Sequence, residues 1–139
     1  MRMNTRTIVV EWGHCDPGAI VYFPRYFEWF DGCTAHVFAS AGCPKESLFE
    51  RYRFAGWPLV ETRAKFLKPC RFGETVTIES SVVEFRRSSF DVEHRLFNAG
   101  ELAVEAFETR VWTIRHPHDP NRLKGEPVPQ DVIASLSAS

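Results

Sequence analysis

The chain has 139 residues, of which 44% are apolar and 25% charged, and its formal net charge is −1. These values fit one globular domain with a hydrophobic core. The balanced charge, with no basic run, argues against nucleic acid or an anionic membrane as the main partner. No apolar run is long enough to span a bilayer. The 4 cysteines form no Cys-x-x-Cys pair, and residues 1–10 contain no secretory segment, so we expect reduced thiols and a cytoplasmic protein.

A strand, a tight turn and a long helix are the first predicted elements. The strand covers Thr5 to Trp12, and Asp16-Pro17-Gly18 has the composition of a turn. Pro24 suits the first turn of a helix that runs to Ala41 and stops before Gly42 and Pro44. Apolar residues cover most of the circumference of this helix, which predicts a buried core helix.

The rest of the chain predicts mostly strands. A short charged segment, 45–53, forms a helix or turn, and strands follow over 59–67, 75–86, 90–97 and 101–115, with a final helix over 130–136. A change of phase at Val82-Val83 predicts a bulge, and Asn98-Ala99-Gly100 predicts a turn between the last two strands. One helix beside a run of strands indicates an α+β domain with an antiparallel sheet. The last strand carries apolar residues on both faces, so we expect a homo-oligomer in which free strand edges pair.

Asp16 is the candidate for chemistry because it stands on a turn just before a helix N-terminus. The first N–H groups of a helix lack internal partners and carry partial positive charge, so they stabilise a developing oxyanion. A carboxylate beside such a site suits attack on an acyl carbonyl. Among the nearby aromatic residues, Tyr22, Tyr26 and Trp57 are the candidates for an acyl pocket, and the others are assigned to the core.

Arg86 and Arg87 form the candidate phosphate site, since arginine suits bidentate phosphate contacts. Adjacent strand residues point to opposite faces, so only one of the pair is expected to reach a given phosphate. His14-Cys15-Asp16 and His116-x-His118-Asp119 contain metal-ligand residue types without a zinc spacing, and no metal is expected. The chain has no Gly-rich phosphate loop, no Gly-x-Ser-x-Gly elbow and no motif for a cysteine nucleophile.

The segment Gly13-x-Cys15-Asp16-Pro17-x-x-Ile20-Val21-Tyr22-Phe23-Pro24-x-Tyr26-x-x-Trp29-x-Asp31, with Glu84-Phe85-Arg86-Arg87-Ser88-Ser89-Phe90, resembles the signature of the 4-hydroxybenzoyl-CoA thioesterase family. The resemblance implies a single hot-dog domain over residues 1–139, an antiparallel sheet wrapped around one long central helix. It also implies an acyl-CoA thioesterase, acting on an aryl-CoA, that needs no cofactor and assembles as a dimer or a dimer of dimers with active sites at subunit interfaces.

The resemblance also assigns roles to individual residues. Asp16 is expected to be the nucleophile or the general base, and the Phe23 N–H is expected to bind the thioester oxygen. Arg86, Arg87 and Ser88 are expected to face coenzyme A, although Ser88 departs from the lysine that hydroxybenzoyl-specific relatives tend to carry. Three alternatives stay open: a thioesterase for acyl groups carried by a protein, a hot-dog dehydratase or hydratase, and a non-catalytic acyl-CoA binding module.

Overall fold

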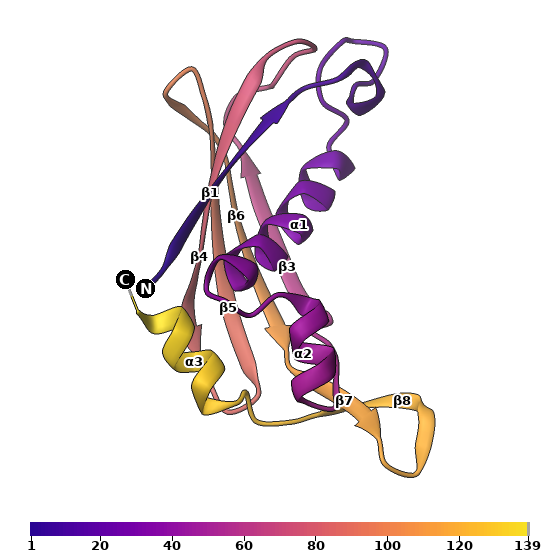
Figure 1. The fold of residues 1–139 in the computed structure, drawn as a ribbon. Coiled ribbons are helices and arrows are strands. Elements are labelled where there is room, and N and C mark those ends of the chain that lie inside the picture. The colour runs from indigo at the N-terminus through magenta and orange to yellow at the C-terminus, as the bar shows by residue number, and fades with distance from the viewer. Residues whose placement is uncertain (139) are drawn as a thin grey trace.

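The structure, a computed structural model, describes residues 1–138 and consists of one long helix against a curved antiparallel sheet (Figure 1). The strands are β1 Met3–Val9, β2 Phe54–Gly56, β3 Leu59–Phe66, β4 Thr75–Phe85, β5 Ser89–Asn98, β6 Glu101–Val111, β7 Thr113–His116 and β8 Asp119–Gly125. The helices are the 3-10 turn η1 Trp12–His14, α1 Pro24–Ser40, α2 Lys45–Arg51 and α3 Gln130–Ser137.

Five strands form the main sheet in the order β1-β4-β5-β6-β3, and all neighbours are antiparallel. A second sheet of three strands, β2-β7-β8, extends from the end of β6 and projects from the lower end of the molecule (Figure 1). The predicted bulge is confirmed, because the register of β4 against β5 shifts between Val82 and Glu84. The predicted turn is confirmed as well, with Ala99 at φ 51° and Gly100 at φ 80°, as a two-residue hairpin requires.

Some element boundaries differ from the prediction. The first strand is β1 Met3–Val9, because Trp12 belongs to the 3-10 turn that follows it. The last predicted strand is divided at Trp112 into β6 and β7. The strand β8 was not predicted, since its residues are almost all polar and exposed and lack an apolar alternation.

The prediction that the long helix is apolar over most of its circumference was wrong, because α1 buries only one stripe of residues. Its buried residues recur every three or four positions: Tyr26, Trp29, Phe30, Cys33, Thr34, Val37 and Phe38. Glu28, Asp31 and His36 on the opposite side are exposed. The prediction treats the alanines of this helix as apolar positions, but their small side chains bury little apolar surface. Within one chain, α1 therefore covers one face of the sheet and leaves its own outer face to solvent.

The outer face of the main sheet is mostly polar, although β6 places Phe107 and Val111 on it and Val104 and Ala106 on the inner face. Across the strands, Lys65 lies 3.9 Å from Glu105, and Arg95 lies 3.2 Å from Glu79. Phe107 is only half-buried, and the guanidinium of Arg63 covers its ring at 4.1 Å. This face is satisfied within one chain and gives no argument for an oligomer.

Two hydrophobic clusters lie along α1. One surrounds the N-terminal half of the helix, including Tyr26, Trp29 and Phe30, and the other surrounds its C-terminal half, including Phe38, Trp57 and Trp112. The Asp16 loop and the start of α1 lie at the upper end of the molecule, and α2 and the β7–β8 hairpin lie at the lower end (Figure 1).

Candidate active site

Asp16 lies on a narrow hairpin between η1 and α1. Cys15 and Val21 form an antiparallel bridge, and the Asp16 N–H donates to the Ile20 carbonyl at 3.0 Å. The Asp16 Oδ1 accepts the Gly18 N–H at 2.8 Å, an Asx-turn that fixes the carboxylate. Among residues 1–138 no group donates to the second carboxylate oxygen, and the residue is half-buried. The turn therefore holds this acid in place and leaves one oxygen free.

The start of α1 presents a single free amide. The Tyr22 N–H donates to the His14 carbonyl at 2.9 Å, and the Arg25 and Tyr26 N–H groups donate to the Tyr22 and Phe23 carbonyls. Pro24 has no N–H. The Phe23 N–H consequently has no acceptor within the described chain, at the positive end of a helix of 17 residues. This amide can bind an anion or a polarised carbonyl oxygen.

A cavity of about 300 Å³ opens between the hairpin, the start of α1 and the end of β3, and Phe23 is one of the residues that line it. Ile20 and Val21, which pair with Asp16 and Cys15 across the hairpin, belong to its wall. The full lining is Ile20, Val21, Phe23, Tyr26, Phe66, Leu67, Lys68 and Pro69. The lining is mostly apolar, as is usual for a site that binds a small organic group.

Two of the predicted acyl-pocket residues lie at this end. Tyr26 lines the cavity and is only 4% exposed, with its ring centroid 5.5 Å from that of Phe66. Burial, together with the neighbouring Cys70, raises the pKa of Tyr26 far above its usual value, so the phenol stays protonated. Tyr22 is 50% exposed, and its ring packs edge-on against that of Phe23 at 5.6 Å.

Trp57 lies elsewhere. Its ring is in the second cluster, stacked on Phe38 at 4.3 Å and capped by the Lys45 ammonium at 5.2 Å. Phe38 follows Tyr26 by three helical turns, or about 18 Å. One chain therefore does not bring Trp57 to the cavity near Asp16.

The predicted coenzyme A residues occupy the β4–β5 hairpin at the other end of the sheet. β4 begins beside Val9, near the Asp16 loop, and its 11 residues carry the chain about 33 Å away. Arg86 is held by Asp91, with N–O distances of 3.1 and 2.5 Å, whereas Arg87 makes no ion pair within the described residues. The Ser88 carbonyl accepts the Trp112 N–H. One chain thus separates these residues from Asp16 and leaves Arg87 as the available cation.

A buried polar network under the middle of α1 was not predicted. Glu108 on β6 accepts from the Thr34 hydroxyl at 2.6 Å and from Arg110 at 2.9 and 3.1 Å, and the His94 Nε2 lies 3.3 Å away. The His94 Nδ1 meets the Ser80 hydroxyl at 2.6 Å. Arg110 also donates to Asp31 on α1 and to the Trp57 carbonyl. The one available sequence signal was that Glu108 and Arg110 continue the inward alternation of Val104 and Ala106.

Glu108 remains ionised in this network. Burial alone would raise the pKa of its carboxyl group, but hydrogen bonds and charges from His94 and Arg110 outweigh burial and lower the pKa to about 2. Both oxygens of Glu108 accept hydrogen bonds, so this carboxylate is suited to holding α1 on the sheet and not to reacting.

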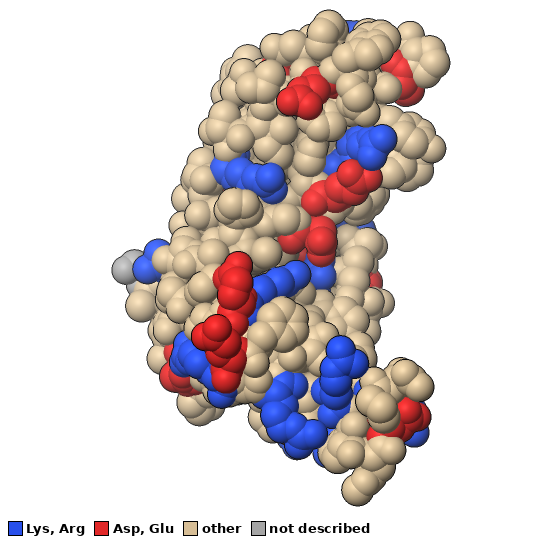
Figure 2. All heavy atoms as spheres, turned by 45° about the vertical axis from the view of Figure 1, so that its right-hand side comes forward, with Lys and Arg blue, Asp and Glu red and all other residues tan. Residues whose placement is uncertain are grey.

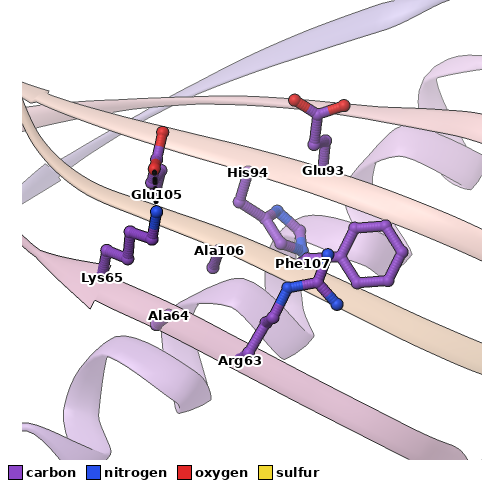
Figure 3. A pocket seen from close by; sticks show the side chains of 8 residues that line it. All are labelled: Arg63, Ala64, Lys65, Glu93, His94, Glu105, Ala106 and Phe107. Atoms are coloured by element: carbon purple, nitrogen blue, oxygen red, sulfur yellow. Dashed lines mark ion pairs between the residues drawn. The ribbon is translucent and has the colours of Figure 1, made fainter.

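A larger hollow, of about 560 Å³, lies over β3, β5 and β6 on the outer face of the sheet (Figure 3). Figure 3 shows that Arg63, Lys65, Glu105 and Phe107 surround it, while the imidazole of His94 points away from them toward the helix. Lys65 is paired with Glu105 and Arg63 with Glu61, while Glu93 has no ion pair within the described residues. All eight lining residues belong to strands, so the hollow lacks the free helix-terminal amide that the start of α1 provides.

Neither a metal-binding cluster nor a membrane-spanning helix is found in the part of the chain that the structure describes. Residues 1–138 contain no group of three or more His, Cys, Asp or Glu side chains that could hold a metal ion. The His116 Nδ1 instead accepts the His118 N–H at 3.1 Å. Among the helices within the same residues, none is long and apolar enough to cross a membrane.

Comparisons with known proteins agree on one family. The model of the thioesterase-like superfamily matches residues 10–136. The chain is 33% identical over 135 residues to the 4-hydroxybenzoyl-CoA thioesterase of Pseudomonas sp. (strain CBS-3), covering 92% of this chain and 93% of that protein.

Solved structures extend the agreement to the fold. An Asp-to-Asn variant of 4-hydroxybenzoyl-CoA thioesterase, complexed with 4-hydroxybenzoyl-CoA, superposes with a TM-score of 0.88 at 30% identity, covering 98% of this chain and 99% of that one. A gentisyl-coenzyme A thioesterase gives 0.82 at 27% identity, covering 96% and 99%. The expected α+β hot-dog fold is confirmed.

Proposed function

Since the chain belongs to the thioesterase-like superfamily, we propose that it is an acyl-CoA thioesterase that hydrolyses an aromatic acyl thioester to the free acid and coenzyme A. One observation carries the proposal: the residue with the free helix-terminal amide, Phe23, lines an apolar cavity, and the Asp16 carboxylate with its free oxygen stands on the hairpin whose other side, Ile20 and Val21, lines the same cavity. Two of the similar proteins are named for 4-hydroxybenzoyl-CoA and gentisyl-CoA.

In the proposed reaction, the thioester carbonyl oxygen accepts the Phe23 N–H, which stabilises the negative charge that develops on that oxygen. Asp16 either attacks the carbonyl carbon, giving an anhydride that water then opens, or removes a proton from an attacking water. Both routes consume one water, break the carbon–sulfur bond and release coenzyme A as the thiol. The Asp-to-Asn variant solved with its substrate supports a carboxylate in this role.

The acyl group is proposed to lie in the cavity next to Tyr26 and Phe66. Aromatic rings favour contact with a second ring, so this lining suits an aryl group. Tyr22, exposed at the mouth, is proposed to cover the thioester side of the substrate.

We propose that the working enzyme is a homo-oligomer, a dimer or a dimer of dimers. The edge strand β3 pairs only with β6 and is exposed along its length. Phe66 and Leu67 at its end line the cavity although they are 48% and 54% exposed, so a second copy at this edge would help to close the cavity.

A second copy would also explain the position of Arg87. Lys and Arg side chains gather at the lower end of the molecule, opposite the Asp16 loop (Figure 2). Coenzyme A needs cations for its phosphates, and a pantetheine arm is shorter than the distance of about 33 Å that separates the two ends of β4. We therefore propose that Arg87 serves the Asp16 site of another subunit, with Arg86 and Ser88 fixing the hairpin. The four unpaired thiols support a reducing compartment, the cytoplasm.

Thiol release from a panel of benzoyl-, hydroxybenzoyl-, naphthoyl- and alkyl-CoA thioesters tests the activity. We expect aryl-CoA thioesters to be preferred, and Asp16→Asn to lower turnover by about three orders of magnitude while acyl-CoA binding, measured by calorimetry, is kept. Binding without turnover in the natural sequence would indicate a non-catalytic binding module. Release only from acyl groups on a carrier protein would indicate the carrier-protein thioesterase.

A further inference from the structure

His14 is held on two sides by the protein. Its Nδ1 accepts the backbone N–H of Glu11 at 2.9 Å. An imidazole nitrogen that accepts a hydrogen bond carries no proton, so the ring is neutral with its proton on Nε2. The ring also stands edge-on against the buried indole of Trp29 on α1, with centroids 5.1 Å apart and planes at 90°.

The backbone of His14 is connected to both halves of the candidate active site. Its carbonyl accepts the Tyr22 N–H at 2.9 Å, and Tyr22 immediately precedes Phe23. Its own N–H donates to the Glu11 carbonyl at 3.0 Å, and the chain reaches Asp16 two residues later. A displacement of His14 would therefore move the carboxylate and the amide relative to each other.

We propose that neutral His14 is a positioning residue, which fixes the distance between the Asp16 carboxylate and the Phe23 amide without contacting the substrate. This inference rests on the proposed function of those two groups. Without the acceptor at Nδ1 the Glu11 N–H loses its partner and the loop loosens, so a side chain that lacks this acceptor should lower activity.

The charged groups near the ring are few. Glu11 is on the same turn, and Cys15 and Asp16 follow His14 in the chain. From α1 the ring meets Trp29, which carries no charge, and one turn before it Arg25 is paired with Glu28 at 2.9 Å. The ring contact is therefore with an uncharged partner, and the Glu11 N–H is the polar group that the imidazole holds.

Two substitutions separate the hydrogen bond from the ring contact. His14→Phe keeps a ring against Trp29 but removes the acceptor, and we expect kcat to fall about tenfold with KM within twofold of the natural value. His14→Asn keeps an acceptor, and we expect kcat within about threefold of the natural value. His36→Phe, on the exposed side of α1, is the matched control and should leave kcat and KM unchanged.

An activity-independent measurement distinguishes failure of this inference from failure of the proposed function. Nitrogen-15 NMR of labelled histidine should show an unprotonated Nδ1 in His14, and the amide signals of Tyr22 and Phe23 should shift in His14→Phe and shift less in His14→Asn. A His14 ring protonated on Nδ1, or a His14→Phe enzyme with the natural kcat, would overturn the proposal.

Discussion

Asp16 and Glu108 are carboxylates in opposite situations. Asp16 lies in a half-buried hairpin, has one protein donor and keeps an oxygen free. Glu108 is 3% exposed and is surrounded by Thr34, His94 and Arg110. The group with the strongly shifted pKa is the structural one, because donors that lower a carboxylate's pKa also occupy the lone pairs that chemistry would need.

The two regions also differ in backbone strain. Ala19, in the Asp16 hairpin, has φ 61°, a left-handed conformation that costs a residue with a Cβ about 1 kcal/mol. The strands that carry the buried network contain no such residue among residues 75–111 apart from the Ala99-Gly100 turn. One left-handed alanine thus lies beside the proposed catalytic carboxylate, and a second, Ala99, lies in the β5–β6 turn, away from the buried network.

The largest expected effects come from neutralising each of the two acids in turn. Glu108→Gln removes the charge that balances buried Arg110, and we expect it to lower the free energy of unfolding by about 3–5 kcal/mol. Asp16→Asn is the matched control: its amide oxygen can still accept from Gly18, so stability should change by no more than about 0.5 kcal/mol while turnover collapses. Urea unfolding and thiol release measure the two quantities. A stable Glu108→Gln protein would contradict the structural role of Glu108.

A pH titration of stability sharpens the same comparison. The pKa of Glu108 is lowered in the folded state from 4.5 to about 2, so its contribution is fully present above about pH 4.5 and is lost as the pH falls toward 2. This shift corresponds to about 3 kcal/mol. We expect the unfolding free energy of Glu108→Gln to fall less than that of the natural chain over this range, as measured by urea titrations at several pH values. If the unfolding free energies of the two proteins fell in parallel with pH, Glu108 would not be the group whose pKa folding lowers.

Arg86 and Arg87 show the same contrast, because Arg86 is paired with Asp91 and Arg87 has no ion-pair partner within the described residues. Burial raises the pKa of Asp91, but Arg86 and Thr109 outweigh it and hold that pKa below its usual value. Arg86→Ala leaves this carboxylate unpaired and should lower the melting temperature with little change in KM. Arg87→Ala should raise KM for acyl-CoA about tenfold, or about 1.4 kcal/mol, without lowering the melting temperature. The reverse pattern would assign phosphate binding to Arg86.

The smallest effect concerns the strain at Ala19. Ala19→Gly should relieve it and raise the free energy of unfolding by about 0.5–1 kcal/mol, while a looser hairpin lowers kcat. Ala99→Gly, at φ 51° in the distant β5–β6 turn, is the control and should stabilise the protein without changing kcat. Calorimetry and thiol release compare them. Equal kcat values for the two variants would show that the Asp16 hairpin tolerates this freedom.

Local patterns in the sequence predicted much of the fold. The Asp16-Pro17-Gly18 turn, the helix beginning at Pro24, the β4 bulge and the hairpin at Ala99-Gly100 all depend on neighbouring residues, and the structure contains each of them. β8 has no apolar alternation and forms because β7 offers it an edge to pair with. Such a strand depends on a partner and carries no signal of its own.

The same division applies to the candidate site. Sequence alone determined which residue types stand together along the chain: an acid on a turn, a helix start one short hairpin later, and a cavity-lining tyrosine on the first turn of that helix. Only the tertiary structure decided that Trp57 and Arg87 lie far from Asp16 in one chain, that Arg86 is occupied by Asp91, and that Glu108 is buried under Thr34. The physical reason is that a turn or a helix terminus is specified by dihedral preferences within a few residues, whereas burial and ion pairing depend on which strands of the sheet become neighbours.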